Sequence, residues 1–132
     1  MKQHAERVID SRELPVWQSP DGARRVSPGV GRDNCGAKGI CTSLFWLAPG
    51  QETVLDVHQG SEEIYYVVSG EARLLLEGET FRVAKGMTVY IPAGASHQSI
   101  NTGEEDLCYF CAFSPPPAGP WRHETENWPR VP

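Results

Sequence analysis

The sequence predicts an all-β fold, a sandwich or a barrel made of short strands. Gly occurs 13 times and Pro 11 times in 132 residues, so the chain contains many potential turns. From residue 40 onward, short apolar segments alternate with turns that contain Gly or Pro. No stretch shows a helical spacing of apolar residues over a useful length, which leaves sheets as the main structure.

The length of the chain predicts a single domain, residues 1–132, with enough chain to bury a core. We expect an irregular N-terminal segment over 1–39, a barrel core over 40–113 and a C-terminal tail over 114–132. In the first segment, the short apolar pieces Val8-Ile9 and Val16-Trp17 could pair as edge strands.

The tail has three consecutive prolines, which exclude it from a sheet interior, and two tryptophans, Trp121 and Trp128. Because two such large rings are poorly accommodated in water, we expect the tail to pack on the barrel or on a second subunit.

The core is expected to contain eight strands. In chain order they are Ile40–Ala48, Thr53–His58, Glu63–Val68, Ala72–Leu76, Thr80–Val83, Met87–Ile91, His97–Asn101 and Leu107–Phe113. Around the turn at Gly78 the pattern alternates, since Ala72, Leu74 and Leu76 share one face of their strand. This alternation predicts a half-buried antiparallel hairpin.

Charge and composition exclude several function classes. The net charge is −5 and the only local basic cluster is Arg24-Arg25, whereas a nucleic-acid binder needs a basic face for phosphates. An anionic membrane surface is disfavoured for the same reason, and no apolar stretch is long enough to span a bilayer. The start of the chain is polar and leads to no signal core. We therefore expect a cytoplasmic protein that binds neither nucleic acid nor membranes.

The four cysteines do not predict a zinc site. Cys108 and Cys111 lie in an apolar, strand-like segment without Gly or Pro, whereas a zinc knuckle needs a tight turn. Residues three apart in a strand point to opposite faces, so these two sulfurs would not converge on one ion. We expect Cys35, Cys41, Cys108 and Cys111 to be free thiols.

A group of polar residues in the core predicts a metal site. Asp56 and His58 are two apart in an expected strand, so both side chains point to one side of the sheet. Glu63 begins the next strand after a short turn, and His97 begins a later strand after a rigid bend. Burying such groups together is costly unless a cation pairs them. Two histidines with a carboxylate suit one divalent ion, such as Fe, Mn, Ni or Zn.

The same residues fall into two motifs, through which the chain resembles the cupin superfamily. The first motif is matched at every spacing by Gly50, Asp56, His58, Glu63 and Gly70, with Asp in place of the usual first His. The second is matched without a departure by Gly86, Pro92, Gly94, His97 and Asn101. The spacing to Gly70 selects Glu63 over Glu62, which should point outward.

The resemblance implies a small, single-domain cupin, or monocupin. Its fold would be a double-stranded β-helix, a jelly-roll barrel with the metal inside one mouth. It also implies a homodimer, with the N-terminal segment and the tail as candidates for exchange between subunits. His4 and His123 lie in the terminal segments and are not expected to be ligands.

Asp56 leaves alternatives open because the family usually has a metal-binding His there. We expect metal ligands at Asp56, His58, Glu63 and His97, since a carboxylate also suits these ions. Alternatively, Asp56 stands off the ion as a general base, and the other three form a facial triad. A barrel that has lost its metal is a third alternative, which the three intact positions disfavour.

The predicted function is that of a metalloenzyme acting on a small organic molecule. Iron would indicate dioxygenase-like chemistry, whereas Zn, Ni or Mn would indicate an isomerase, cyclase or lyase. The alternative is a non-catalytic cupin module that binds a small ligand or a metal, because the fold alone does not decide function.

Overall fold

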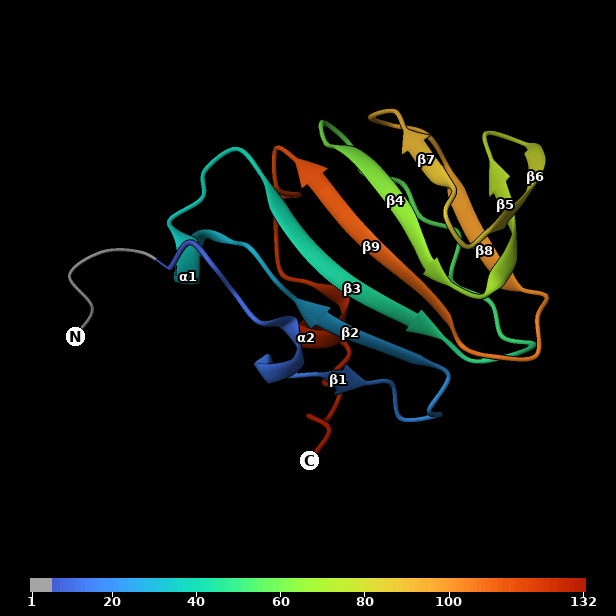
Figure 1. Ribbon diagram of the computed structural model, residues 1–132. Helices are drawn as coiled ribbons and strands as arrows, with labels where there is room; N and C mark the ends of the chain where they lie inside the picture. The colour runs from blue at the N-terminus through green and yellow to red at the C-terminus, as the bar shows by residue number, and fades with distance from the viewer. Residues whose placement is uncertain (1–5) are drawn as a thin grey trace.

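The computed structural model describes residues 6–132, so His4 lies outside the described residues. Within them, two antiparallel sheets form an open barrel, which confirms the all-β prediction (Figure 1). The larger sheet has the order β1 (Trp17–Gln18), β2 (Arg24–Pro28), β3 (Cys41–Leu47), β9 (Leu107–Ser114), β4 (Glu62–Ser69) and β7 (Thr88–Ile91). The smaller sheet has the order β6 (Glu79–Ala84), β5 (Glu71–Leu76) and β8 (His97–Asn101).

Seven of the eight strands expected in the core are present within one or two residues of their predicted ends. In the N-terminal segment β1 lies near the predicted piece at Val16-Trp17, but Val8-Ile9 forms no strand. The sequence reasoning missed β2, which pairs with β3 along its whole length. It also missed three single turns, the 3₁₀ helix η1 (Ser11–Glu13), α1 (Arg32–Cys35) and α2 (Arg122–Thr125).

The expected strand Thr53–His58 is wrong as a continuous strand, although the segment follows the free edge of β8. Bridges form only at Glu52 and Asp56. Between them, side chains replace part of the backbone ladder. The Ser99 amide donates to Thr53 Oγ1 at 2.9 Å, and Gln98 Nε2 donates to the Thr53 carbonyl at 2.7 Å. Such bonds compete with regular pairing, so the segment stays irregular while it still covers the edge.

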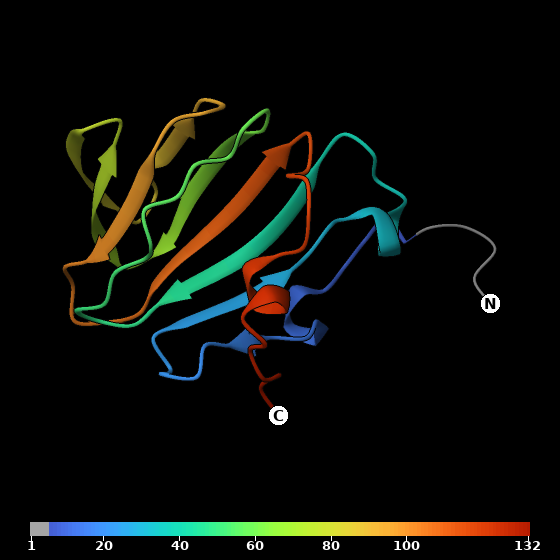
Figure 2. The same ribbon diagram turned by 180° about the vertical axis from the view of Figure 1, so that it is seen from behind.

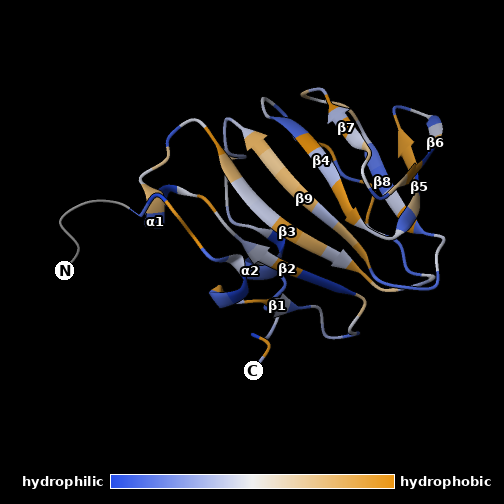
Figure 3. Cartoon of the chain, in the orientation of Figure 1, coloured by the Kyte–Doolittle hydropathy of each residue, from blue (hydrophilic) through white to orange (hydrophobic). Residues whose placement is uncertain are grey.

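The core lies between the two sheets and follows the alternation of the strands. In β4 the residues Glu63, Tyr65 and Val67 are buried, whereas Glu62 and Ile64 are exposed. Figure 3 shows that β4 is hydrophilic where it begins and hydrophobic toward its end, beside the more uniformly hydrophobic β9. In β5 the buried residues are Ala72 and Leu74, as the hairpin pattern predicted. The inward face of β4 is therefore apolar except at Glu63.

Two residues of the predicted motifs have clear structural roles. Gly70 has φ +82°, and a Cβ there would lie 2.8 Å from the Asp106 carbonyl oxygen, so only glycine fits. Asn101 is buried and donates to the carbonyls of Leu47 and Glu105, while its own oxygen accepts from the Gly103 amide. Asn101 thus fixes the connection between β8 and β9.

The tail packs on the barrel of its own chain, one of the two expected arrangements. Figure 2 shows the segment with α2 crossing β2 on its way to the C-terminus beside β1. The Trp121 ring meets Phe113 edge-on, with centroids 5.4 Å apart, and Trp128 is buried. Arg130 forms a bridge with Trp17. The tail is therefore part of the folded structure.

The four cysteines are free thiols in the described part of the chain, as predicted. Cys41, Cys108 and Cys111 are buried, and burial raises the pKa of Cys108 to about 11. Among residues 6–132, no helix has the length and apolar character needed to cross a membrane.

Candidate metal centre

Two strands and one irregular segment bring His58, Glu63 and His97 together inside the barrel. Glu63 is the first inward-facing residue of β4 and is 3% exposed, while its neighbour Glu62 points outward to the Tyr90 hydroxyl. His97 is the first residue of β8 and is equally buried. His58 comes from the irregular segment on the edge of β8. The outward orientation predicted for Glu62 is confirmed.

The donor atoms of these three residues form a compact group, all within 4.8 Å of one another. Glu63 Oε1 lies 3.4 Å from His97 Nε2 and 3.6 Å from His58 Nε2. With bonds of about 2.1 Å, two ligands of one ion are separated by about 3.0 to 3.4 Å. The spacing of the group therefore fits a single ion, with little movement of the side chains.

A hydrogen bond directs the lone pair of His97 toward Glu63. His97 Nδ1 lies 3.0 Å from the Ala95 carbonyl oxygen. A carbonyl can only accept, so Nδ1 carries the hydrogen and the neutral ring presents a bare Nε2 to Glu63. Glu63 Oε1 is buried and has no hydrogen-bond partner among the described residues. A bare imidazole nitrogen and an unpartnered carboxyl oxygen that face each other in a buried place fit a cation between them.

Burial also shifts the pKa values of the group. Desolvation, followed by the charge of Asp56, raises the pKa of Glu63 to about 9. Desolvation lowers the pKa of His58, although the Asp56 carboxylate opposes that shift. His58 is therefore kept neutral, the form that ligates metals, and Glu63 ionises readily only when a positive charge is close.

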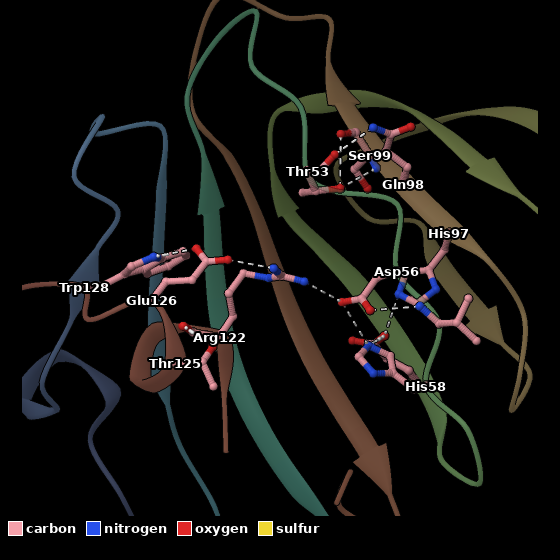
Figure 4. Close-up of polar contacts among 12 residues, drawn as sticks. Thr53, Asp56, His58, His97, Gln98, Ser99, Arg122, Thr125, Glu126 and Trp128 are labelled. Atoms are coloured by element: carbon pink, nitrogen blue, oxygen red, sulfur yellow. Dashed lines mark hydrogen bonds and ion pairs between the residues drawn. The ribbon is translucent and has the colours of Figure 1, made fainter. Parts of the chain in front are cut away.

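Asp56 lies beside this group and is not part of it. Its Oδ2 is 3.9 Å from His58 Nε2 and 3.5 Å from Arg122 Nη2, and its Oδ1 accepts from the Val57 amide. Figure 4 shows the Arg122 side chain reaching from the tail toward Asp56. Sequence reasoning missed Arg122, because no local pattern links residues that are 66 positions apart.

A cavity of about 380 Å³ joins the candidate metal centre to the tail. Its walls are rich in aromatic rings, contributed by Phe45, Tyr65, Tyr109, Phe113, Trp121 and Trp128. Tyr65 and Tyr109 stack with centroids 4.2 Å apart, and the Tyr109 hydroxyl is hydrogen-bonded to Ser99 at 2.8 Å. His123 also lines the cavity, where its ring packs against Trp17 and not against the three-residue group. The cavity therefore combines a polar floor with apolar walls.

The fold and the site define a small antiparallel β-barrel with imidazole and carboxylate groups gathered inside one mouth. Residues 43–113 match the family model described as the cupin domain. The chain belongs to the cupin family, and its fold is the jelly-roll barrel that the resemblance implied.

Proteins similar to this chain include examples from an archaeon and from bacteria. The chain is 42% identical over 81 residues to an uncharacterized protein of Methanocaldococcus jannaschii, covering 60% of this chain and 65% of that protein. It is 30% identical over 111 residues to the polyketide synthase CurC of Streptomyces cyaneus, covering 83% of this chain and 70% of that protein. The crystal structure of a predicted oxalate decarboxylase from Thermotoga maritima superposes with a TM-score of 0.72 at 26% identity, covering 82% of this chain and 98% of that one. This chain thus spans slightly less than two thirds of the M. jannaschii relative.

Proposed function

We propose that the protein is a metal-dependent enzyme that acts on a small organic molecule with oxygen donors. The observation that carries this proposal is the unpartnered, buried oxygen of Glu63 facing two imidazole nitrogens at the floor of a cavity. His58, Glu63 and His97 would hold one divalent ion, Fe, Mn, Ni or Zn. When bound, such an ion supplies a Lewis acid that polarises a carbonyl or stabilises an enolate.

The residues around the ion have separable roles in this proposal. Three protein ligands leave positions open to a substrate oxygen. Asp56 stands beside the three ligands, where it can take a proton from a bound substrate as a general base. The stacked rings of Tyr65 and Tyr109 would bind an apolar or planar body and exclude water. Burial raises the pKa of Tyr109 to about 12, so its hydroxyl stays protonated.

Proton-transfer chemistry, as in an isomerase, cyclase or lyase, is the reaction class that this arrangement supports best. The support is a carboxylate that stands beside the ligands and faces the same cavity as they do. The polyketide synthase CurC and the predicted oxalate decarboxylase are both named for chemistry on oxygen-rich carbon compounds. A dioxygenase-like reaction is the expectation if the native metal is iron.

The metal content of the purified protein tests the proposal. Protein expressed without added metal and purified without chelator is compared with the His97→Ala variant by elemental analysis. Near-stoichiometric metal in the wild type and its loss in the variant are the expected results. Zn, Ni or Mn would direct substrate screens to isomerisation and cyclisation, and iron to O₂ uptake. Absence of metal from both proteins, even after reconstitution, would overturn the proposal.

A non-catalytic module that binds a small ligand or a metal is the second candidate. It is favoured by the aromatic lining of the cavity, which suits retention of a ligand as well as turnover. The discriminating measurement is solvent exchange at the ion, for example by water-proton relaxation of the Mn²⁺-loaded protein. Fast exchange indicates open positions, as an enzyme needs, whereas its absence would favour the binding module.

We also propose that the protein is a cytoplasmic homodimer and that the outer face of the larger sheet forms the dimer interface. Ile64, Tyr66, Tyr90 and Phe110 lie together there, and each is between 38% and 54% exposed despite its apolar character. Ile64 pairs with Tyr90, and Tyr66 pairs with Phe110. These residues lie on three neighbouring strands, β9, β4 and β7, which are about 4.8 Å apart, so their side chains form one continuous patch.

Light scattering coupled to gel filtration checks the dimer. Phe110→Glu should yield a monomer that still binds metal, whereas Val8→Glu, an exposed change outside the sheet, should remain a dimer. A wild-type monomer at micromolar concentration would contradict the dimer proposal.

A further inference from the structure

We infer that Arg122, supplied by the C-terminal tail, holds Asp56 out of the coordination sphere of an ion at the candidate metal centre. Arg122 is thus a positioning residue, and it sets how many coordination positions stay open to a ligand. This inference rests on the proposed function, since it requires that His58, Glu63 and His97 bind a metal.

The first observation is the position of the Asp56 carboxylate. Its Oδ2 lies 3.9 Å from His58 Nε2, whereas two ligands of one ion lie about 3.0 to 3.4 Å apart. The carboxylate therefore lies just beyond the spacing expected of a ligand that shares an ion with His58, and it contacts the Arg122 guanidinium instead, at 3.5 Å. The Val57 amide, which donates to Oδ1, is a neutral partner that does not compete with a cation.

The second observation is that the tail fixes the Arg122 guanidinium from its other side. Arg122 Nη1 donates to Glu126 Oε1 at 2.8 Å, and Glu126 Oε2 accepts from the indole of Trp128 at 3.1 Å. Trp128 is buried against the barrel. Figure 4 shows this row of side chains, from Trp128 through Glu126 and Arg122 to Asp56. The guanidinium is therefore held in place by a buried anchor.

The charge of Arg122 determines whether Asp56 would move toward a bound ion. A carboxylate next to a divalent ion is strongly attracted to it in a partly buried site. The guanidinium offers Asp56 an alternative positive partner, and it repels any closer approach of positive charge. A fourth protein ligand would occupy one open position and would cancel more of the charge of the ion. Arg122 thereby preserves both the open positions and the Lewis acidity that the proposed chemistry needs.

The pairing of these two residues also accounts for the one departure from the family motif. The position of Asp56 is held by a metal-binding His in the family pattern. A neutral imidazole there would gain nothing from a guanidinium, whereas a carboxylate is oriented by it. In this inference, Asp56 at the motif position and Arg122 in the tail therefore act as a pair.

The test is a double-mutant cycle on metal affinity, with wild type, Arg122→Ala, Asp56→Asn and the double variant. Binding of Zn²⁺ is measured by competition with a chromogenic chelator, and binding of Co²⁺ by its visible absorption. We expect Arg122→Ala to bind Zn²⁺ at least about tenfold more tightly and to change the Co²⁺ spectrum, because a fourth ligand enters. Asp56→Asn should change the wild-type affinity by less than about threefold and should remove the whole gain in the double variant. Arg122→Lys should restore wild-type affinity and spectrum in large part.

Two control variants separate this effect from charge and from tail structure. Arg24→Gln removes a positive charge that also lines the cavity and lies over the Trp128 ring but pairs with Asp21 and not with Asp56, so it should leave the Co²⁺ spectrum unchanged. Glu126→Gln removes the charge of the outer partner of Arg122 but keeps an oxygen that can accept from Nη1, so it should not tighten metal binding. Additive effects in the cycle, or an Arg122→Ala spectrum identical to wild type, would overturn the inference alone. A loss of affinity above about tenfold in Asp56→Asn would also overturn it, since Asp56 would already be a ligand. Failure of the wild type to bind any metal would overturn the proposed function, and the inference with it.

Discussion

The floor of the cavity, at Glu63, and its other end, under the tail, differ in how their charged side chains are paired. At the floor, Glu63 is almost fully buried and one of its oxygens has no hydrogen-bond partner within residues 6–132, while two imidazole nitrogens face it. Under the tail, Asp56, Arg122 and Glu126 are partly exposed and satisfy one another. The first group still lacks a partner for one oxygen, which a bound cation would supply, and the second is complete as it stands. An incomplete polar group in a well-packed interior is thus the better guide to where a ligand belongs.

The largest effect is expected from Glu63→Gln. This change keeps the shape of the side chain, removes the charge that attracts a cation, and should lower metal affinity by more than about a hundredfold. The metal-free variant should nevertheless unfold at a higher temperature than the metal-free wild type, because no buried carboxyl remains to resist ionisation. Calorimetry in the presence of a chelator measures this. A lower unfolding temperature would show that Glu63 has a stabilising partner.

The pH dependence of the unfolding free energy also reports on the buried carboxyl of Glu63. The carboxyl of Glu63 has a pKa of about 9 when folded and 4.5 as an unperturbed group. Between these values the unfolded chain has released the proton and the folded chain keeps it, so stability falls as pH rises. The slope from this one group is at most about 1.4 kcal/mol per pH unit. Denaturant unfolding of metal-free wild type and Glu63→Gln from pH 5 to 9 should show this decline only in the wild type.

A smaller effect is expected from Trp128→Ala at the other end. Trp128 is 6% exposed, and its truncation should cost about 3 kcal/mol of unfolding free energy by leaving a cavity. Metal content should remain near that of the wild type, because no ligand comes from the tail. Chemical denaturation and elemental analysis of the same preparation check both parts. Loss of metal along with stability would indicate that the two ends of the cavity fold as one unit.

The smallest effect is expected from Glu126→Gln. Its partner Arg122 is partly exposed, and exposed ion pairs contribute about 0 to 1 kcal/mol. The unfolding free energy should therefore change by less than about 1 kcal/mol. Urea denaturation measures this change. A much larger loss of unfolding free energy would show that Asp56 and Arg122 depend on Glu126 for more than a surface ion pair.

The two ends also differ in how far the sequence predicts them. His58, Glu63 and His97 sit at fixed spacings in short strands and turns, so local patterns place them correctly, and alternation separates Glu63 from Glu62. The position of Asp56 was not predictable in the same way. Its place depends on Arg122, and their contact joins a barrel edge to a tail by packing that has no periodic signature.

The same reasoning explains the errors in the strands. β2 was missed because its residues, Arg24–Pro28, include two charged residues and a proline and lack clear alternation. The Thr53–His58 segment has the composition of a strand, but the Thr53 and Gln98 side chains take over hydrogen bonds that a strand would make. Both outcomes depend on neighbours in space and not on neighbours in sequence.

The irregular segment that carries Asp56 and His58 has a second consequence, for solubility. By hydrogen bonding to Ser99 and His97, it covers a strand edge that would otherwise offer unpaired amides and carbonyls to another chain. Substitutions that loosen this segment and so reshape the cavity would therefore also expose the edge of β8, where another chain could pair with it. A change of ligand preference made in this segment would therefore also raise the tendency to aggregate. Tolerated substitutions should concentrate in the tail, because the tail lines the cavity and does not cover the edge of β8.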